Sequence, residues 1–126
     1  MVLHLKYQRN MLEVIGITNC NTVKKTRQWL EQKDIHYSFR DLKKEPLSPN
    51  ELADLVMKAG LETLVNRRGR KWKMLGLADK QLSDNDLFEV LLEHQTMIKR
   101  PVLRYGEAVM VGFDEDAVAT FIEEGS

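Results

Sequence analysis

The chain has 126 residues, and its 19 lysines and arginines balance its 19 aspartates and glutamates to a formal net charge of 0. A balanced chain has no overall field to attract nucleic acid or an anionic membrane, so we expect neither as a partner. No apolar run approaches the roughly 18 residues of a membrane-spanning helix. Cys20 is the only cysteine, which excludes an internal disulfide and a Cys-rich metal site. We expect a single-domain, monomeric, cytoplasmic protein without a bound metal.

The first third of the chain has the pattern of a βαβ unit. Residues 1–11 show no regular period, and we interpret them as an N-terminal extension. The apolar run 12–17 is typical of a strand buried on both faces, and a helix is expected at 22–33. Residues 37–40 alternate between aromatic and polar side chains, as strands do. Two strands joined by a helix in this way are predicted to be parallel. The apolar face of the helix carries Val23, Thr26 and Leu30, with Trp29 at its edge.

Residues from about 46 to 98 interrupt this pattern with a helical insertion. The segment Ser48-Pro49-Asn50-Glu51 is a capping box with proline at the first helical position, and Gly60 is expected to end that helix. A second helix is expected to begin at Ser83, with acidic residues in its first turn. Residues 61–77, between these helices, are expected to form shorter helical pieces.

The strand pattern returns near the C-terminal end. Residues 102–104 and 108–111 predict an antiparallel hairpin, and Asp114 is the expected cap of a last helix. The inward face of that helix is expected to hold Ala117, Val118, Phe121 and Ile122. The order of elements predicts an α/β protein. Its four-stranded mixed sheet would contain parallel strands at 13–17 and 37–40 and the hairpin, with one inserted helical subdomain.

Cys20 lies between the predicted first strand and the helix that follows it. Ligands of open α/β sheets bind at the carboxyl ends of strands, and the positive end of a helix dipole favours a thiolate. Lys24 and Lys25, one turn later, could add to this effect. The alternative is an inert buried thiol, as lone cysteines usually are, although the flanking Asn19 and Asn21 are not typical of a core. Position alone leaves both interpretations open.

Two further segments carry positive charge. Arg100 precedes Pro101, which marks the entry of the predicted hairpin and is a candidate for a cis peptide bond. Arg100 would then lie near the sheet, where a guanidinium can bind an oxyanion through two hydrogen bonds; the alternative is a surface arginine beside a turn. The run 67–73 has five cations and one tryptophan. Such a run can bind RNA or phosphate, but a solvated surface is the preferred interpretation.

Other site types lack the residues that they need. His4, His36 and His94 are scattered, without a carboxylate pair or a second cysteine at metal-ligand spacing. The sequence has no phosphate-binding loop, dinucleotide fingerprint or nucleophile elbow. A hydrolase or a metalloenzyme is therefore disfavoured.

Several segments form a set that is specific as a whole, although each piece alone is common. They are Gly16–Lys25, Trp29-Leu30, Leu64–Gly69 with Trp72, Lys99–Val102 and Val111–Phe113. This set resembles the arsenate reductase-like family of ArsC, Spx and YffB proteins, with the YffB-like branch most similar, and it extends from residue 13 to about residue 122. The resemblance implies a thioredoxin-like fold with a helical insertion. It places the family's nucleophile at Cys20 and its cis-proline at Pro101.

The resemblance also implies a weakened oxyanion site. In glutaredoxin-coupled arsenate reductases, three arginines bind the oxyanion. One of these positions falls on Arg100, but the other two hold Asn66 and Gly112. Arg67 and Arg68 adjoin Asn66 but are expected to point elsewhere on an α-helix. Efficient arsenate reduction is therefore not expected.

The function that the resemblance implies is a monothiol, glutathione-dependent thiol reductase with Cys20 as nucleophile and Arg100 as a second catalytic residue. Val23 occupies the position of the second cysteine that Spx relatives often carry, so the chain has no resolving cysteine. Glutathione would therefore be the co-substrate, with glutaredoxin as a further candidate partner and no bound cofactor. The expected substrate- and glutathione-binding residues are Asn19, Asn21, Thr22, Lys24, Asn66, Arg67 and Pro101. Two alternatives remain: an arsenate reductase with a reduced oxyanion-binding set, and a non-enzymatic Spx-like regulator that binds RNA polymerase.

Overall fold

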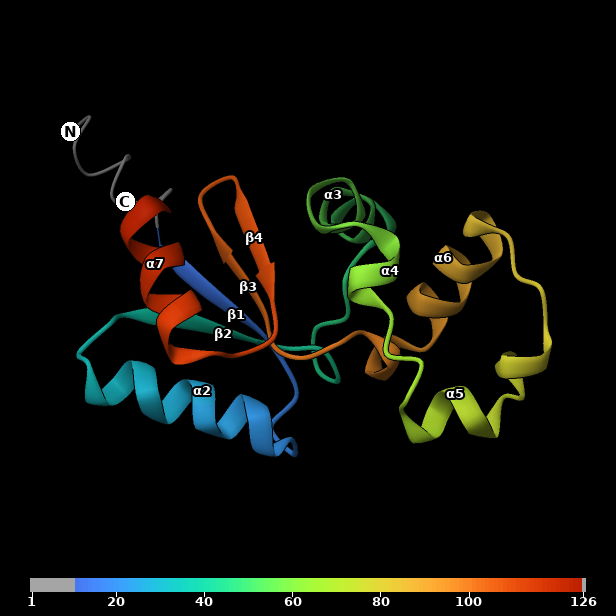
Figure 1. Cartoon of the computed structure of the whole chain (residues 1–126), viewed down its shortest axis with the longest axis horizontal. Coiled ribbons are helices and arrows are strands. Elements are labelled where there is room, and N and C mark those ends of the chain that lie inside the picture. Colours follow the sequence, from blue (N-terminus) through green and yellow to red (C-terminus); the bar gives the residue numbers. More distant parts are fainter. Residues whose placement is uncertain (1–10, 126) are drawn as a thin grey trace. The chain divides into compact units, whose positions relative to one another are not determined.

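The computed structural model describes residues 11–125, which form two compact units along the chain (Figure 1). The described part of the first unit, here called the sheet unit, consists of residues 11–41 and 100–125. The second, the helical unit, consists of residues 42–99. Of the expected N-terminal extension, residues 1–10 lie outside the described residues.

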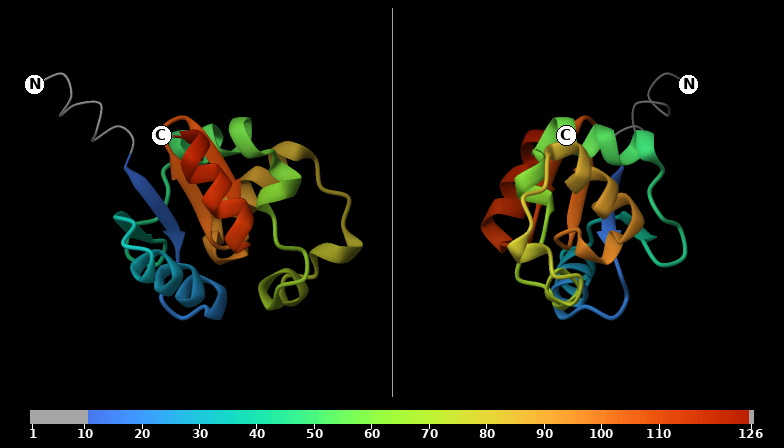
Figure 2. Two further views of the ribbon diagram at one scale, coloured as in Figure 1. Left: turned by 60° about the vertical axis from the view of Figure 1, so that its left-hand side comes forward. Right: turned by 90° about the vertical axis from the view of Figure 1, so that its right-hand side faces the viewer.

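The sheet unit contains a four-stranded mixed sheet, which confirms the prediction. Its strands are β1 (Leu12–Gly16), β2 (Tyr37–Asp41), β3 (Val102–Tyr105) and β4 (Ala108–Val111). Their order is β2-β1-β3-β4, with β1 parallel to β2 and antiparallel to β3, and with β3 antiparallel to β4. The hairpin thus joins the same sheet as the βαβ unit (Figure 2).

Two helices of the sheet unit bury their apolar faces against this sheet. They are α2 (Asn21–Gln32) and α7 (Glu115–Gly125). The core that they share with the strands consists of Leu12, Val14, Leu30, Leu103 and Val118. The carboxylate of Asp114 accepts the amide N–H of Ala117 at 2.9 Å, so the predicted cap is confirmed. Ala117 itself is exposed, contrary to expectation, because Val118 is the residue of this turn that faces the core.

The helical unit consists of short helices joined by turns. Its elements are α3 (Pro49–Ala59), α4 (Leu61–Leu64), α5 (Arg70–Met74), η1 (Leu77–Asp79), α6 (Asp84–Glu93) and η2 (Gln95–Met97). Capping boxes at Ser48 and Ser83 begin the two longest helices, and Gly60 ends α3. The side chain of Gln95 is buried and bonds both the amide and the carbonyl of Leu47, at 2.7 and 2.9 Å. This link between distant segments has no counterpart in the sequence pattern.

Candidate functional site

Cys20 is positioned by the close approach of α2 to the end of β1. At Gly16, the last residue of β1, an added Cβ would lie 2.7 Å from a methyl carbon of Val23, so this packing requires glycine. Cys20 has an extended backbone, with φ −150° and ψ 121°, and its carbonyl accepts the amide N–H of Lys24 at 2.9 Å. Cys20 is therefore the N-cap residue of α2, at the junction of strand and helix where the sequence places it, and its thiol is partly exposed.

The thiol lies among groups that favour its ionised form. Burial raises the pKa of Cys20, but the amide of Val23, the guanidinium of Arg100 and the amide of Thr22 together outweigh it, so the pKa is lowered from its ordinary value. The Cys20 side chain makes no capping hydrogen bond. The amides of Val23 and Thr22 instead stabilise the sulfur when it is ionised. The direction agrees with the prediction from the helix N-terminus.

Arg100 reaches the thiol because β3 begins beside the end of β1. Ile15 pairs with Val102 in antiparallel register, and Arg100 lies two residues before Val102. The Arg100–Pro101 peptide bond is cis, as expected. The carbonyl of the buried Pro101 accepts the amide N–H of Gly112 at 2.8 Å. The guanidinium acts on the thiol both as a hydrogen-bond donor and as a charge.

The other predicted binding residues near Cys20 are accessible, but the two lysines do not act on the thiol as expected. Asn19, Asn21, Thr22 and Lys24 all have exposed side chains, so they are accessible to a bound molecule. Thr22 acts on the thiol through its backbone amide. Lys24 and Lys25 were expected to lower the pKa of the Cys20 thiol, but both are exposed and neither is among the groups that lower it. Solvent and salt screen charges that extend into water.

Asn66 and Arg67 lie in the helical unit, in a turn between α4 and α5. The carboxamide oxygen of Asn66 accepts the amide N–H of Arg68 at 3.1 Å, a local bond that competes with helix formation. The expectation of an α-helix at this point is therefore wrong. The Arg67 guanidinium bonds both carboxylate oxygens of Glu62, at 2.6 and 3.1 Å, and lies 4.7 Å from the ring centre of Trp72.

Gly112, the third position of the oxyanion set, has a backbone that disfavours an arginine. Its φ is +93°, in the region that only glycine adopts readily, although no atom lies within 4 Å of an added Cβ. Replacement by arginine would strain the backbone whatever the space available.

Thr26, which the sequence placed only on the apolar face of α2, is bonded to the first turn of this helix, the turn that follows Cys20. Its side chain is fully buried, and its hydroxyl donates to the carbonyl of Thr22 at 2.7 Å. The sequence signal that could have indicated this bond is a threonine on an apolar helical face, four positions after a residue of the first turn.

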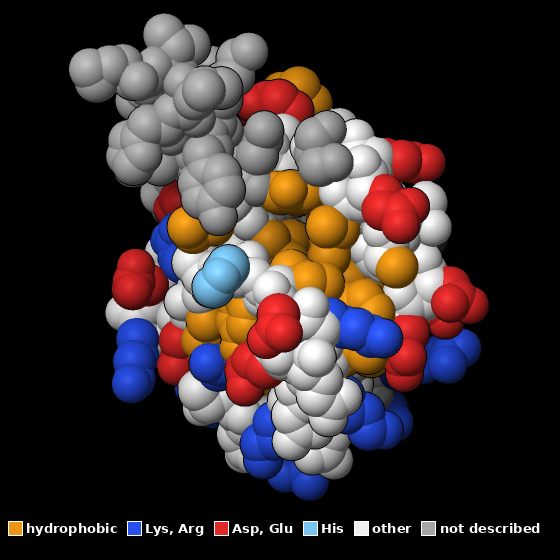
Figure 3. Space-filling model, turned by 90° about the vertical axis from the view of Figure 1, so that its left-hand side faces the viewer, with side chains coloured by type: hydrophobic (Ala, Val, Ile, Leu, Met, Phe, Trp, Pro, Cys, Tyr) orange, Lys and Arg blue, Asp and Glu red, His pale blue; other side chains and the backbone are white. Residues whose placement is uncertain are grey.

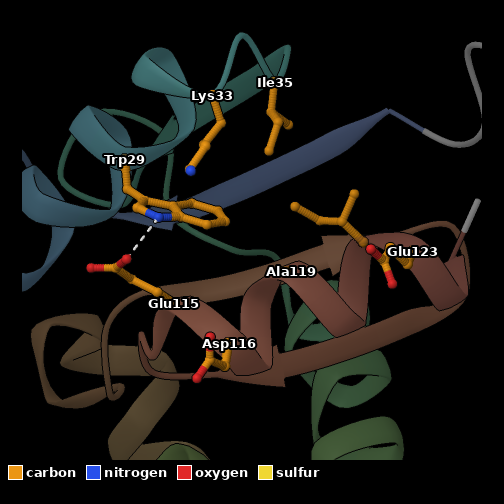
Figure 4. Close-up of a pocket in the computed structure, with 8 residues that line it drawn as sticks. Trp29, Lys33, Ile35, Glu115, Asp116, Ala119 and Glu123 are labelled. Atoms are coloured by element: carbon orange, nitrogen blue, oxygen red, sulfur yellow. Dashed lines mark hydrogen bonds between the residues drawn. The ribbon is translucent and has the colours of Figure 1, made fainter.

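A groove between α2 and α7 is chemically unlike the surroundings of Cys20. Apolar side chains gather on this side of the molecule, with both acidic and basic side chains around them (Figure 3). Trp29, Ile35 and Ile122 line the groove of about 390 Å³ together with Lys33 and several carboxylates, and the indole N–H of Trp29 donates to Glu115 at 3.1 Å (Figure 4). The residues that line the groove include no thiol and no hydroxyl, and its acidic rim repels anions. We therefore place the candidate site at Cys20.

Residues 11–125 contain no group of three or more histidines, cysteines or carboxylates placed to hold a metal ion. No helix in this part of the chain is both long and apolar enough to cross a membrane.

Known proteins resemble this chain over most of its length. An uncharacterized protein of Haemophilus influenzae is 35% identical over 106 residues, which cover 83% of this chain and 93% of that protein. The global transcriptional regulator Spx 2 of Oceanobacillus iheyensis is 29% identical over 106 residues, 82% of this chain and 78% of that protein. A solved structure, the YffB (PA3664) protein, has a TM-score of 0.81 at 33% identity and covers 87% of this chain and 97% of its own.

These likenesses agree with the resemblance that the sequence motifs indicate. The shared fold is thioredoxin-like, with a mixed sheet of order β2-β1-β3-β4. The model of the ArsC family matches residues 15–121. The chain is therefore a member of the ArsC family, which includes arsenate reductase-like proteins.

Proposed function

We propose that the protein is a monothiol, glutathione-dependent thiol reductase in which the Cys20 thiolate is the nucleophile. The observation that carries this proposal is the arrangement around the sulfur. Two backbone amides and the Arg100 guanidinium act on a thiol of lowered pKa that is still accessible to solvent. A low-pKa, accessible thiol is the usual form of a reactive cysteine.

The reaction has two thiol–disulfide exchange steps. First, the Cys20 thiolate attacks a glutathionylated thiol, the substrate S–S bond breaks, and the substrate leaves as its thiolate while Cys20 carries glutathione. A second glutathione, as thiolate, then attacks this mixed disulfide, which releases oxidised glutathione and regenerates the Cys20 thiolate. In sum, the substrate thiol is released, and the one incoming glutathione leaves as oxidised glutathione together with the glutathione that the substrate carried. Cys20 is the only cysteine, so an external thiol must complete the cycle.

Arg100 has two roles in this proposal. It stabilises the attacking and departing thiolate, and it can hold a carboxylate of glutathione through charge-assisted hydrogen bonds. Asn19, Asn21, Thr22, Lys24 and Pro101 would line the bound glutathione, and Asn66 and Arg67 remain predicted binding residues. Glutaredoxin is a candidate second donor. The cytoplasm, where glutathione keeps thiols reduced, is the proposed compartment.

Two alternatives rest on specific observations. Membership of the ArsC family supports an arsenate reductase, but here with Asn66 and Gly112 in place of two arginines. The likeness to Spx 2, a global transcriptional regulator, supports a regulator that binds RNA polymerase without chemistry. An arsenate turnover assay tests the first alternative. Co-purification with RNA polymerase tests the second.

The deciding experiment is intact-mass analysis of the reduced protein after exposure to oxidised glutathione. We expect one glutathione adduct on wild type and faster adduct formation than on Arg100→Ala. Arg104→Ala is the matched control, because Arg104 lies in the same unit but pairs with Glu13. Turnover is then measured with a glutathionylated peptide and glutathione, with Cys20→Ser as the inactive reference. A wild-type protein that forms no adduct would rule out the proposal.

A further inference from the structure

The hydroxyl of Thr26 makes a hydrogen bond that the helix backbone does not need. Thr26 is fully buried, and its Oγ1 donates to the carbonyl oxygen of Thr22 at 2.7 Å. In an α-helix this carbonyl also accepts the amide N–H of residue 26, four positions later. The hydroxyl is thus a second donor to one carbonyl in the first turn of α2, the turn that adjoins Cys20.

The acceptor of this bond and the amide that faces the thiol are parts of one peptide group. The carbonyl of Thr22 and the N–H of Val23 share a planar, delocalised unit. A hydrogen bond accepted at the carbonyl polarises that unit, and such chains strengthen each bond by about 10–30%. The hydrogen bond from the Val23 amide is the largest single interaction that lowers the pKa of Cys20, while Arg100 acts through both a hydrogen bond and its charge.

We propose that Thr26 is a positioning residue for Cys20: its hydroxyl, acting through the peptide group of Thr22 and Val23, strengthens the amide that faces the sulfur. This inference deepens the proposed function and rests on it for its biological use, but it concerns the acidity of the thiol alone. The other groups that act on the thiol are the Arg100 guanidinium and the Thr22 amide. The Thr22 amide belongs to the preceding peptide group, which the Thr26 hydroxyl does not bond.

The test compares two substitutions in the full chain. Thr26→Val keeps the branched shape of the buried side chain but removes the hydroxyl, whereas Thr26→Ser keeps the hydroxyl. Thiolate absorbance is titrated against pH for both variants and for wild type. We expect the thiolate fraction at neutral pH to fall about 1.5- to 4-fold in Thr26→Val and to return close to wild type in Thr26→Ser. Thr120→Val, which alters an exposed threonine of α7, is the matched control and should titrate like wild type.

Either of two results would overturn the inference. One is a Thr26→Val thiol that titrates like wild type. The other is a Thr26→Ser thiol that shifts as much as Thr26→Val, which would assign the effect to packing. Thermal unfolding of each variant sets a temperature at which all are folded. Failure of wild type to form the glutathione adduct, with the Thr26→Val shift intact, would remove the proposed function and leave this inference standing.

Discussion

Two segments, one in each unit, contain the cations that the sequence places in the functional site, and they use their polar groups differently. Beside Cys20, backbone amides and Arg100 act on a sulfur atom that can gain or lose a proton. In the turn between α4 and α5, Asn66 bonds the backbone of its own turn, and Arg67 pairs with Glu62, whose pKa that hydrogen bond holds below its usual range.

The difference shows that local charge density does not by itself locate a reactive site. The run 67–73 has five cations, yet Arg67 is bound to a carboxylate that is already ionised at neutral pH. Arg100 is a single cation, but its partner is a group whose ionisation it changes. A charge affects chemistry when it favours one state of a group that has two.

The largest expected effect concerns arsenate. We expect wild type to reduce arsenate two to four decades more slowly than a reductase with three oxyanion-binding arginines. Two absent partners, each worth about 1.5–3 kcal/mol, raise the barrier by about 3–6 kcal/mol. Glutathione adduct formation on the same preparation shows that the thiol is active. Arsenate turnover equal to that of a three-arginine enzyme would contradict the prediction.

An arginine at either altered position of the oxyanion set has its own structural cost. Asn66→Arg adds a cation, although it removes the local bond of the turn. Gly112→Arg also adds a cation, but it should lower the thermal stability, because φ is +93° at this position. Parallel arsenate assays and melting curves of the two variants separate added charge from added strain.

A further prediction compares the two arginines, Arg100 and Arg67, directly. Arg100→Ala should raise the pKa of Cys20 and slow glutathione adduct formation at neutral pH by about tenfold, because the thiolate loses a charged partner. Arg67→Ala should leave the thiol titration unchanged. Thiolate absorbance and adduct rates are measured on both variants. An equal shift in both would show that the two segments do not differ as we describe.

Most of the fold could be predicted because its signals are local. The buried run at β1, the capping boxes at Ser48 and Ser83, and the turn before β4 each occupy a few neighbouring residues. The place of Cys20 at the start of α2 follows from the same local pattern. Its meeting with Arg100 follows only when β1 and β3 are known to be neighbours.

What the sequence did not predict depends on contacts between distant segments or on competing local bonds. The buried Gln95 meets Leu47 across 48 positions of the chain. At Asn66, the carboxamide accepts the amide N–H of Arg68 and the backbone amide donates to the carbonyl of Met97, so this segment is a turn and not the expected helix. The exposed Lys24 and Lys25 have the right sequence spacing from Cys20, but their side chains extend into water.

Another prediction tests whether the side chain of Asn66 stabilises its own turn. Asn66→Ala should lower the free energy of unfolding by about 1 kcal/mol, because the amide of Arg68 loses its acceptor. Asn66→Asp keeps an oxygen acceptor and should recover most of this loss. Urea unfolding measures the change, and the adduct rate is followed in parallel. A slower adduct with no loss of stability would instead make Asn66 a glutathione-binding residue.

The smallest expected effect is the dependence of stability on pH. Folding lowers the pKa of Cys20, so ionisation stabilises the folded protein fully above the unfolded thiol pKa of about 8.5. This contribution is lost as the pH falls through the folded pKa. The free energy of unfolding of wild type, relative to Cys20→Ser, should therefore be constant in acid and should rise between the two pKa values. Other titrating groups cancel in this difference.

Arg100→Ala should narrow the pH range over which the free energy of unfolding rises, because it brings the folded pKa of Cys20 nearer to the unfolded value. Urea unfolding under reducing conditions, from about pH 6 to about pH 9.5, measures all three proteins. A difference that shrinks as the pH rises would mean that burial outweighs the amides and Arg100, and that the thiol is of the inert kind.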